Sequence, residues 1–455
     1  MTRGVSMKEE VIVNLVPKRL IAGAAVLALV ASACSSAAAT PTAAPSVAAP
    51  SVAPVVTVAP TAAPVTIEWW HISTGEPGKS IWQSAADAYT AAHPNVKINI
   101  TILENEAFKS KLQTSMQAGT PPDLFQSWGG GTMASQADAG MLKDITAAVA
   151  PWASTIDPGS LGIYSYKSKQ YGIPWDMGMI GFWYNKALFT KAGITATPKT
   201  WDELLTDVDK LKAAGITPYA IAGKDEWPGM HLWTYLVLRN GGGDALTQMV
   251  QTGNWNTDAC IAGGTAVKAL VDKKPFQTGF LSAVYDKGEA AAMGNGQAAM
   301  ELMGQWAPGV EQSNSTSGKG IGANLGYFAF PSVTGGKGGA TDAVGGGNGI
   351  AVGKNAPAEA IDFLHYLNSP AVANQINLAN MGLSTTVGTA GTVTDPNLQM
   401  VLAGRAQAKF VQLYLDQATS PAMGASINDA TAGLFAGTST PTQVCQAITT
   451  AAAKK

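Results

Sequence analysis

Apolar and polar residues follow two different periods along the chain, and the two periods take turns from residue 65 onward. "VTIEWWHI" (65–72) alternates at every second residue, which predicts a strand, whereas "SIWQSAADAYTAAHP" (80–94) repeats apolar residues at helical spacing. The order continues with a strand over 95–103, a helix over 106–119 and a strand over 123–128. This alternation predicts an α/β domain with a largely parallel sheet.

The loops that follow the predicted strands are the expected ligand-binding region, because the carboxyl ends of parallel strands meet at one edge of a sheet. Here those loops contain His71, Glu76, Glu104 and Trp128. One loop, "GEPGKS", has the outline of a phosphate-binding loop, but Ser73 stands where that motif needs glycine. We therefore expect a tight turn whose backbone meets a ligand.

Further patterns extend to the end of the chain. Thr200, followed three residues later by Glu203, predicts a capped helix that stops at Gly215. The remaining patterns predict strands over 171–189, 218–223, 325–333 and 345–353, and helices over 231–243, 264–276, 289–306 and 356–370.

The first 65 residues have the composition of an export signal followed by a spacer. Lys18 and Arg19 precede 14 apolar or small residues that end at Ala33, which is shorter than the roughly 20 residues of a membrane span. The segment before Cys34 resembles a bacterial lipobox, although Ala31 stands where Leu is usual. Residues 1–33 are thus a predicted lipoprotein signal peptide, and an ordinary signal peptide cut nearby is the alternative.

Residues 34–65 are predicted to be a lipidated cysteine followed by a spacer rich in Ala, Pro, Ser, Thr and Val, which has little apolar surface to bury. We expect a chain that is exported and lipid-anchored to the outer face of the cytoplasmic membrane. The chain's net charge is −2, and losing residues 1–33, with four basic and two acidic side chains, makes it −4. That balance argues against nucleic acid as a partner.

The remaining cysteines, Cys260 and Cys445, form an even pair in a chain with export features. A disulfide between them and two buried free thiols are both compatible with the sequence. About 390 residues follow the spacer, which suggests two lobes or domains.

Six motifs in order resemble the extracellular solute-binding proteins of ABC sugar importers, the family of the maltose-binding protein. They are "PPDLFQSWGG", "GIPWDMGMIGFWYNKALF", "TWDELLTDVDKLKAAGITPYA", "MGNGQAAMELMGQW", "LGYFAFPSV" and "GGGNGIAV". Met293 and Gln297 depart from the family pattern, which has Phe and Lys there. The resemblance covers roughly residues 66–440, and the opening "WWHISTGEPGKSIWQ" is most like members that bind xylobiose and other oligosaccharides.

The resemblance implies a two-lobed, type II periplasmic-binding-protein-like fold with a hinge and a ligand cleft between the lobes. Lobe one would comprise 66–175 and 331–383, and lobe two 176–330 and 384–455, with chain crossings near 175–181, 330–332 and 382–386. It also implies a monomer without cofactor, metal or enzymatic activity, which delivers an oligosaccharide to ABC permease subunits. Cys260 and Cys445 would share a lobe, which makes their pairing geometrically possible.

Aromatic and planar polar side chains are the groups that recognise sugars, because they match pyranose faces and paired hydroxyls. Trp128 follows a predicted strand, and the resemblance implies contacts from Trp175, Trp227 and Trp306. Candidate polar contacts are Glu76, Glu104, Asp176, Glu226, Asn105 and Asn348, and the histidines His71 and His231 are candidates as well. For each, rim packing or a solvated loop position is the alternative. Trp233 and Trp201 are expected in the core.

Two other functions compete with sugar binding. A secreted glycosidase would need two carboxylates across a glycosidic bond, and Asp176 with Glu226 is the pair that can be imagined. A polyamine receptor would need an acidic cleft. A metal receptor has little support, because the four histidines are scattered and form no cluster with cysteine.

Overall fold

The computed structural model describes residues 63–454. The predicted signal peptide, Cys34 and the spacer up to residue 62 lie outside these residues.

The first sheet holds five strands in the order β2-β1-β3-β13-β6. Strand β1 (Val65–His71) is parallel to β2 (Val96–Ile102) and to β3 (Leu124–Ser127). Strand β13 (Gly349–Val352) is antiparallel to β3 and to β6 (Gly172–Pro174). The sheet is therefore mixed, and the prediction of a largely parallel sheet is correct only for its β2-β1-β3 half.

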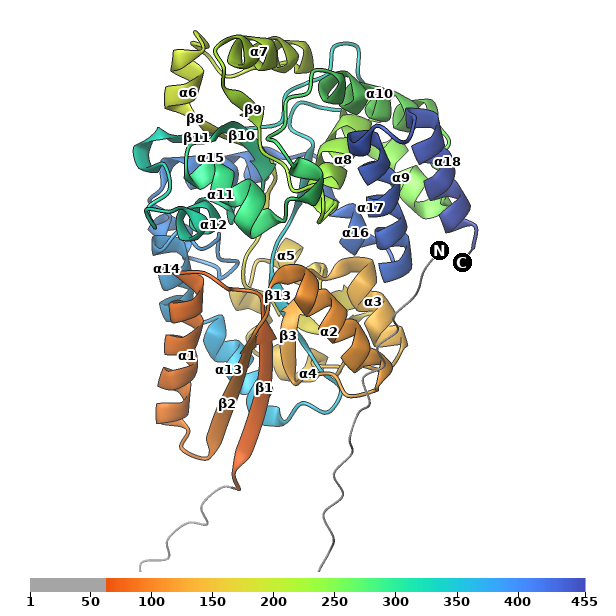
Figure 1. The fold of residues 1–455 in the computed structure, drawn as a ribbon. Coiled ribbons are helices and arrows are strands. Elements are labelled where there is room, and N and C mark those ends of the chain that lie inside the picture. Colours follow the sequence, from red (N-terminus) through yellow and green to blue (C-terminus); the bar gives the residue numbers. More distant parts are fainter. Residues whose placement is uncertain (1–62, 455) are drawn as a thin grey trace, which may run out of the picture. The chain divides into compact units, whose positions relative to one another are not determined.

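Helices cover this sheet as the apolar patterns predicted. Helix α1 (Gly78–Ala92) and helix α13 (Ala358–Leu367) lie beside β1 and β2 (Figure 1). Trp69 and Trp82 are buried where these elements meet, with ring centroids 5.5 Å apart. Trp69 therefore belongs to the core rather than to a ligand site. Helix α2 (Asn105–Gln117) follows β2 directly, so its first turn begins at the carboxyl edge of the sheet.

The second sheet holds four strands in the order β11-β8-β10-β9. Strand β10 (Ala298–Met303) is antiparallel to β8 (Gly181–Asn185) and parallel to β9 (Thr217–Tyr219), while β11 (Leu325–Phe328) forms the edge. Helix α7 (Trp201–Ala213) begins with the capping box that the sequence predicted. These two mixed α/β lobes give the two-lobed α/β arrangement that the sequence predicted.

Strand β10 corrects one prediction, because the sequence predicted helix over 289–306. Only the start of that range is helical, in a π-helical turn η3 (Tyr285–Ala290) and in α11 (Ala291–Gly294). All six residues of "AAMELM" are buried between two other strands. Ala, Met, Glu and Leu favour helices in isolation, but complete burial in the centre of a sheet outweighs that preference.

A third, small sheet joins the crossing segments in the order β14-β12-β7. Beyond it, helices α8 (Trp227–Gly241), α10 (Asp258–Asp272), α17 (Pro421–Ala436) and α18 (Pro441–Ala452) pack together. The other helices and strands are α3 (Gly130–Asp138), α4 (Thr146–Val149), α5 (Pro158–Gly162), β4 (Ser165–Tyr166), β5 (Lys169–Gln170), β7 (Gly178–Met179), α6 (Lys186–Lys191), α9 (Gly243–Thr252), α12 (Ala307–Asn314), β12 (Ala343–Gly346), α14 (Pro370–Leu378), α15 (Pro396–Gln407), β14 (Val411–Leu413) and α16 (Leu415–Ala418).

The segment after β11 stays with the second lobe for longer than the sequence predicted. The buried Arg239 guanidinium on α8 donates to the backbone carbonyls of Phe330, Pro331, Gly339 and Asp342. The chain next reaches the first sheet at β13. We therefore propose that the second crossing lies near residue 347 rather than at 330–332.

Cys260 on α10 and Cys445 on α18 form a disulfide. Of the two alternatives that the sequence left open, the structure has the paired one. The bond joins residues 185 positions apart and ties the last helix to the core of the second lobe.

Candidate functional site

A cavity of about 180 Å³ lies where loops of both lobes meet. From the first lobe it is lined by the loop 72–78 after β1, by the first turn of α2, and by residues that follow β3 and β6. From the second lobe it is lined by α8, η3, α12 and the segment 414–417. The cavity therefore lies at the carboxyl edge of β1, β2 and β3, where the predicted parallel strands led us to expect the ligand-binding region.

One wall of the cavity is a chain of rings from the second lobe. Tyr285 packs against Trp227 at 5.2 Å between centroids, and Trp227 packs against His231 at 5.4 Å. The chain continues from His231 to Tyr414 at 5.0 Å and from Tyr414 to Trp306 at 6.0 Å. Most of these contacts are edge-to-face, so each ring fixes its neighbour's orientation. The result is a rigid aromatic wall with polar atoms at its edges.

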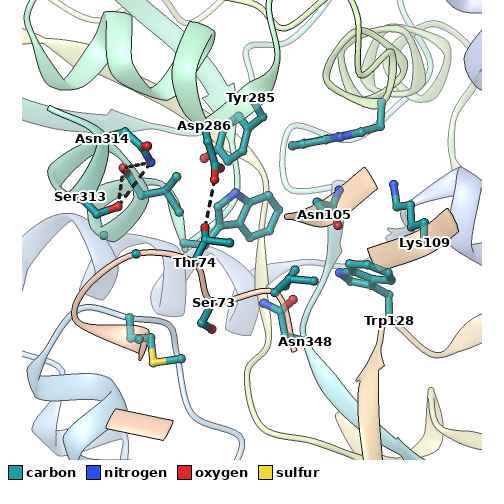
Figure 2. A pocket seen from close by; sticks show the side chains of 18 of the residues that line it. Ser73, Thr74, Asn105, Lys109, Trp128, Tyr285, Asp286, Ser313, Asn314 and Asn348 are labelled. Carbon is teal, nitrogen blue, oxygen red and sulfur yellow. Dashed lines mark hydrogen bonds between the residues drawn. The ribbon is translucent and has the colours of Figure 1, made fainter. Parts of the chain in front are cut away.

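Two tryptophans of the first lobe also line the cavity. Trp175 is held edge-to-face against Trp82, whose indole Nε1–H donates to Ser73 Oγ at 3.1 Å. Trp128 directly follows β3 and packs against Phe108 of α2. Lys109 lies 5.7 Å from the centre of the Trp128 ring, and Figure 2 shows the two side chains next to each other. Both rings are therefore supported from behind by side chains of the first lobe.

The position of Trp306 depends on a glycine two residues earlier. A Cβ atom on Gly304 would overlap the six-membered ring of Trp306, so only glycine lets the indole lie against the backbone there. Trp306 then precedes α12, whose residues Gly309, Val310, Ser313 and Asn314 also line the cavity. The sequence "GQW" thus sets the position of one ring of the aromatic wall.

The polar lining contains amide, carboxylate and ammonium groups. Thr74 Oγ1 of the first lobe donates to Asp286 Oδ2 of the second at 3.1 Å, as drawn in Figure 2. Burial raises the pKa of Asp286. Lys109 Nζ donates to Glu106 at 2.8 Å, and Asn348 faces the cavity between Gln126 and Asp176. These groups can donate to and accept from hydroxyls around the aromatic surface.

The sequence matches the family model of the bacterial extracellular solute-binding proteins over residues 73–374, which is more than half of the chain. The chain belongs to this family. The match to the model includes much of the cavity lining, from Ser73 to Asn348.

Individual relatives fit this assignment. An uncharacterized ABC transporter extracellular-binding protein of Pyrococcus horikoshii is 28% identical over 58% of this chain and 59% of its own length. A multiple sugar-binding protein of Streptococcus mutans is 26% identical over 54% of this chain and 58% of its own. The chain thus spans somewhat less than two thirds of these curated relatives.

A solved structure from a study of xylan utilization by the thermophilic bacterium Caldanaerobius polysaccharolyticus has a TM-score of 0.79 and 28% identity. The likeness covers 85% of this chain and 99% of that one. Unlike the curated relatives, this structure is matched over nearly its whole length.

The cavity of this solute-binding protein brings together seven of the residues that the sequence proposed. Among polar groups these are Glu76, Asn105 and Asn348. The aromatic ones are Trp128, Trp175, Trp227 and Trp306. The histidine candidate His231 also lines the cavity, and burial lowers its pKa to about 3, so its imidazole is neutral. The structure supports the positions of these residues, while their contacts with a ligand stay a prediction.

Three other proposed residues, His71, Glu104 and Glu226, lie outside the cavity lining. The His71 ring is buried and accepts from the Ser73 backbone N–H, and burial lowers its pKa to about 4. Glu104 caps α2 by accepting from two backbone N–H groups. Glu226 precedes α8 at a φ of 64°, and its pKa is raised to about 7 by burial and by Asp429.

Asp176 is the fourth such residue, and the structure places it in the hinge. It is fully buried, and its oxygens accept from Leu383 N–H, Gln305 Nε2 and Asn348 Nδ2 at 2.6, 2.6 and 2.9 Å. Burial raises its pKa to about 6. The carboxylate therefore joins segments at the chain crossings. Asp176 is not among the residues that line the cavity, and whether it contacts a ligand stays a prediction.

Several lining residues were missed from the sequence. Lys109 lies one helical turn after Asn105, so helical spacing could have identified it. Tyr285 and Asp286 lie in an irregular π-helical turn that has no periodic signal. Tyr414, Asp416 and Gln417 come from a short segment far along the chain, and only the tertiary fold brings them to the cavity.

Within residues 63–454, no group of His, Cys, Asp and Glu side chains has an arrangement that could hold a metal ion. Nor does any helix in this part of the chain have the length and apolar character needed to cross a membrane.

Proposed function

We propose that this protein is the extracellular receptor of an ABC importer and that it binds an oligosaccharide in the cavity between its lobes. The observation that carries the proposal is the aromatic wall from Tyr285 to Trp306, which faces Trp128 and Trp175 of the other lobe. Aromatic surfaces on both sides with amide and carboxylate groups between them suit pyranose rings and their hydroxyls.

The number of rings favours a ligand of more than one sugar unit. The opening segment resembles members that bind xylobiose, and the structural relative comes from a study of xylan utilization. The curated relative from Streptococcus mutans is named a multiple sugar-binding protein. Together these support a xylo-oligosaccharide as the first ligand to test.

The rest of the proposal follows from the family and the N-terminal sequence. Lobe closure around the sugar would present it to permease subunits in the membrane. Cys34 would carry the lipid that holds a monomeric receptor at the outer face of the cytoplasmic membrane, with residues 35–65 as spacer.

The two carboxylates that the sequence suggested for a glycosidase are not among the residues that line the cavity. Asp176 is fully buried with three protein donors, and Glu226 lies outside the cavity lining. One observation supports a cationic ligand such as a polyamine. Glu76, Asp286 and Asp416 line the cavity, and among residues 63–454 Lys109 is the one Lys or Arg side chain in its lining. That ligand is the second candidate.

Thermal unfolding with a panel of compounds tests the proposal, because a ligand that binds only the folded state raises the melting temperature. At a hundredfold excess over Kd, the free energy of unfolding rises by about 2.7 kcal/mol. We expect xylobiose or xylotriose to raise the melting temperature, with affinity then measured by calorimetry. Stabilisation by spermidine and by no sugar would overturn the sugar assignment and support the polyamine alternative. Release of the chromophore from a nitrophenyl xyloside would revive the glycosidase alternative.

A further inference from the structure

Three glutamates lie buried together in the second lobe, on the side of η3 and α12 away from solvent. Glu289 belongs to η3, Glu301 to β10 and Glu311 to α12, and their exposures are 0, 0 and 1%. Glu289 Oε2 accepts from the Ala222 N–H, whereas the carboxyl oxygens of Glu301 and Glu311 are buried without a hydrogen-bond partner among residues 63–454. A carboxyl that holds a proton can donate it to a neighbouring carboxyl, so protons can satisfy these oxygens.

The cluster has no positive partner in the described part of the chain. None of the three glutamates takes part in an ion pair among residues 63–454. Glu289 Oε1 and the Tyr285 hydroxyl, which is also buried, have no hydrogen-bond partner within the same residues. No metal-binding arrangement occurs there either. Since an unpaired buried carboxylate is very costly, protons are the remaining means of neutralising these groups.

Two of these three elements, η3 and α12, contribute to one wall of the cavity. Tyr285 and Asp286 of η3 line it, as do Gly309, Val310 and Ser313 of α12. Helix α12 packs on η3, so a change in the charge of Glu289 or Glu311 acts directly on that wall. A π-helical turn of this kind is often found at functional sites.

We propose that Glu289, Glu301 and Glu311 form a proton-sharing cluster that positions η3 and α12, so that the cavity keeps its shape and its sugar affinity only while the cluster is protonated. The proposal rests on the proposed function for its ligand, and it makes these glutamates positioning residues rather than ligand contacts.

The groups that face the cluster cannot neutralise negative charge. They are Tyr219 from β9, Asp225 from the loop before α8, and Tyr285 from η3. Burial raises the pKa values of both tyrosines well above 10, so their rings stay neutral. Burial raises the pKa of Asp225 to about 6, so above that pH its carboxylate adds a further negative charge.

The direction of the pH dependence follows from the raised pKa values. Burial raises the pKa of Glu301 to about 8 and, with help from the Glu301 charge, the pKa values of Glu289 and Glu311 well above their usual range. The folded state therefore binds more protons than the unfolded state. The cluster's contribution to stability is fully present below about pH 4.5 and is lost as the pH rises through about 8.

The first experiment needs no ligand. The melting temperature of the wild-type protein, of Glu301→Gln and of the control Asp272→Asn, an exposed carboxylate paired with Lys268, is measured between about pH 5 and about pH 9. We expect wild type and D272N to lose melting temperature towards alkaline pH, and E301Q to lose clearly less, because an amide cannot ionise. If E301Q does not fold, Glu311→Gln takes its place.

Two further measurements test the link to the cavity. Hydrogen exchange in segments 285–294 and 307–314, corrected for its intrinsic pH dependence, should rise at alkaline pH in wild type and less in E301Q. Xylotriose affinity, measured by calorimetry, should fall as the pH rises. The total decrease should be about tenfold for each pKa unit by which xylotriose binding raises the pKa of the cluster. If xylotriose fails to bind at every pH, the sugar assignment fails, while melting and exchange still decide the cluster.

The proposal is overturned by any of three results. One is a wild-type melting temperature that does not fall towards alkaline pH. Another is an E301Q profile that follows that of wild type in both melting and exchange. The third is an increase in melting temperature on adding excess Ca²⁺ at about pH 9 that occurs in wild type and not in E301Q, because a cation rather than a proton would then neutralise the cluster.

Discussion

Replacing Asp176 tests whether the hinge is held by the hydrogen-bond network seen in the structure. Leu383 N–H, Gln305 Nε2 and Asn348 Nδ2 donate to its two oxygens, and Asn348 Oδ1 accepts in turn from Gln126 Nε2 at 2.8 Å. Asp176→Ala removes all three acceptor contacts and leaves these donors without a partner in a fully buried site. Breaking a buried charged network of this kind costs about 3–5 kcal/mol.

The expected shift in melting temperature follows from the size of the folded region. With an unfolding entropy of about 2.1 cal/mol/K per residue over roughly 390 residues, a loss of about 4 kcal/mol lowers the melting temperature by about 5 °C. Asp207→Asn is the control, because Asp207 is also buried but pairs with Lys210 inside one helix. Loss of the Asp207–Lys210 ion pair should lower the free energy of unfolding by about 1 kcal/mol or less.

The isosteric change Asp176→Asn adds a test of pH dependence. Burial raises the pKa of Asp176 to about 6, so its contribution to stability is present below about pH 3.8 and is lost as the pH rises through about 6. When the pH falls from 8 to 5, the free energy of unfolding of wild type should therefore rise by about 1.4 kcal/mol more than that of D176N. D176N should accordingly be more destabilised at pH 5 than at pH 8 when urea unfolding is compared at the two pH values.

Two results would refute this reasoning about the hinge. If the free energy of unfolding of D176A lies within about 0.5 kcal/mol of the wild-type value, the network does not hold the chain crossings together. If D176N abolishes sugar binding and leaves stability unchanged, Asp176 is a ligand contact, as the family resemblance implied, and its position outside the cavity lining is wrong.

Three other changes have clear expected outcomes. Trp306→Ala should weaken sugar binding in calorimetry by at least about 2 kcal/mol, roughly thirtyfold, while Trp70→Ala, which removes a ring outside the cavity lining, should not; equal affinity in W306A and wild type would contradict the cavity assignment. Cys260→Ser should lower the free energy of unfolding by up to about 5 kcal/mol, because the bond closes a loop of 185 residues, and a reducing agent should destabilise wild type but not C260S. Cys34→Ser should abolish incorporation of labelled fatty acid in cells, and persistent labelling would argue against the lipobox.

The outcome for β10 illustrates how far local sequence reaches. The helix that begins at Trp201 was predictable because its cap, its Glu203 and its terminating glycine act within one turn of the chain. The residues of β10 give the opposite local signal, since Ala, Met and Leu prefer helices. Their strand conformation depends on β8 and β9, which are supplied by segments far away in the sequence.

The cavity shows the same division. The sequence determined the family, the α/β class and the four tryptophans Trp128, Trp175, Trp227 and Trp306, because a large ring next to a glycine or a strand end has few other roles. The sequence could not assign a role to each carboxylate. An acidic residue in a loop has the same sequence context whether it caps a helix, binds a ligand or holds a hinge. Tertiary structure decided that Glu104 is a cap and Asp176 a hinge residue.

Tertiary structure alone also brought Glu289, Glu301 and Glu311 together, from a turn, a strand and a helix. Burial and the distance between like charges decide what a carboxyl group does, and both quantities depend on contacts between residues that lie far apart along the chain. Apolar periodicity and local end signals depend on near neighbours, which is why the sequence by itself was enough for most of the elements and for the four tryptophans of the cavity, but not for Tyr285 and Tyr414.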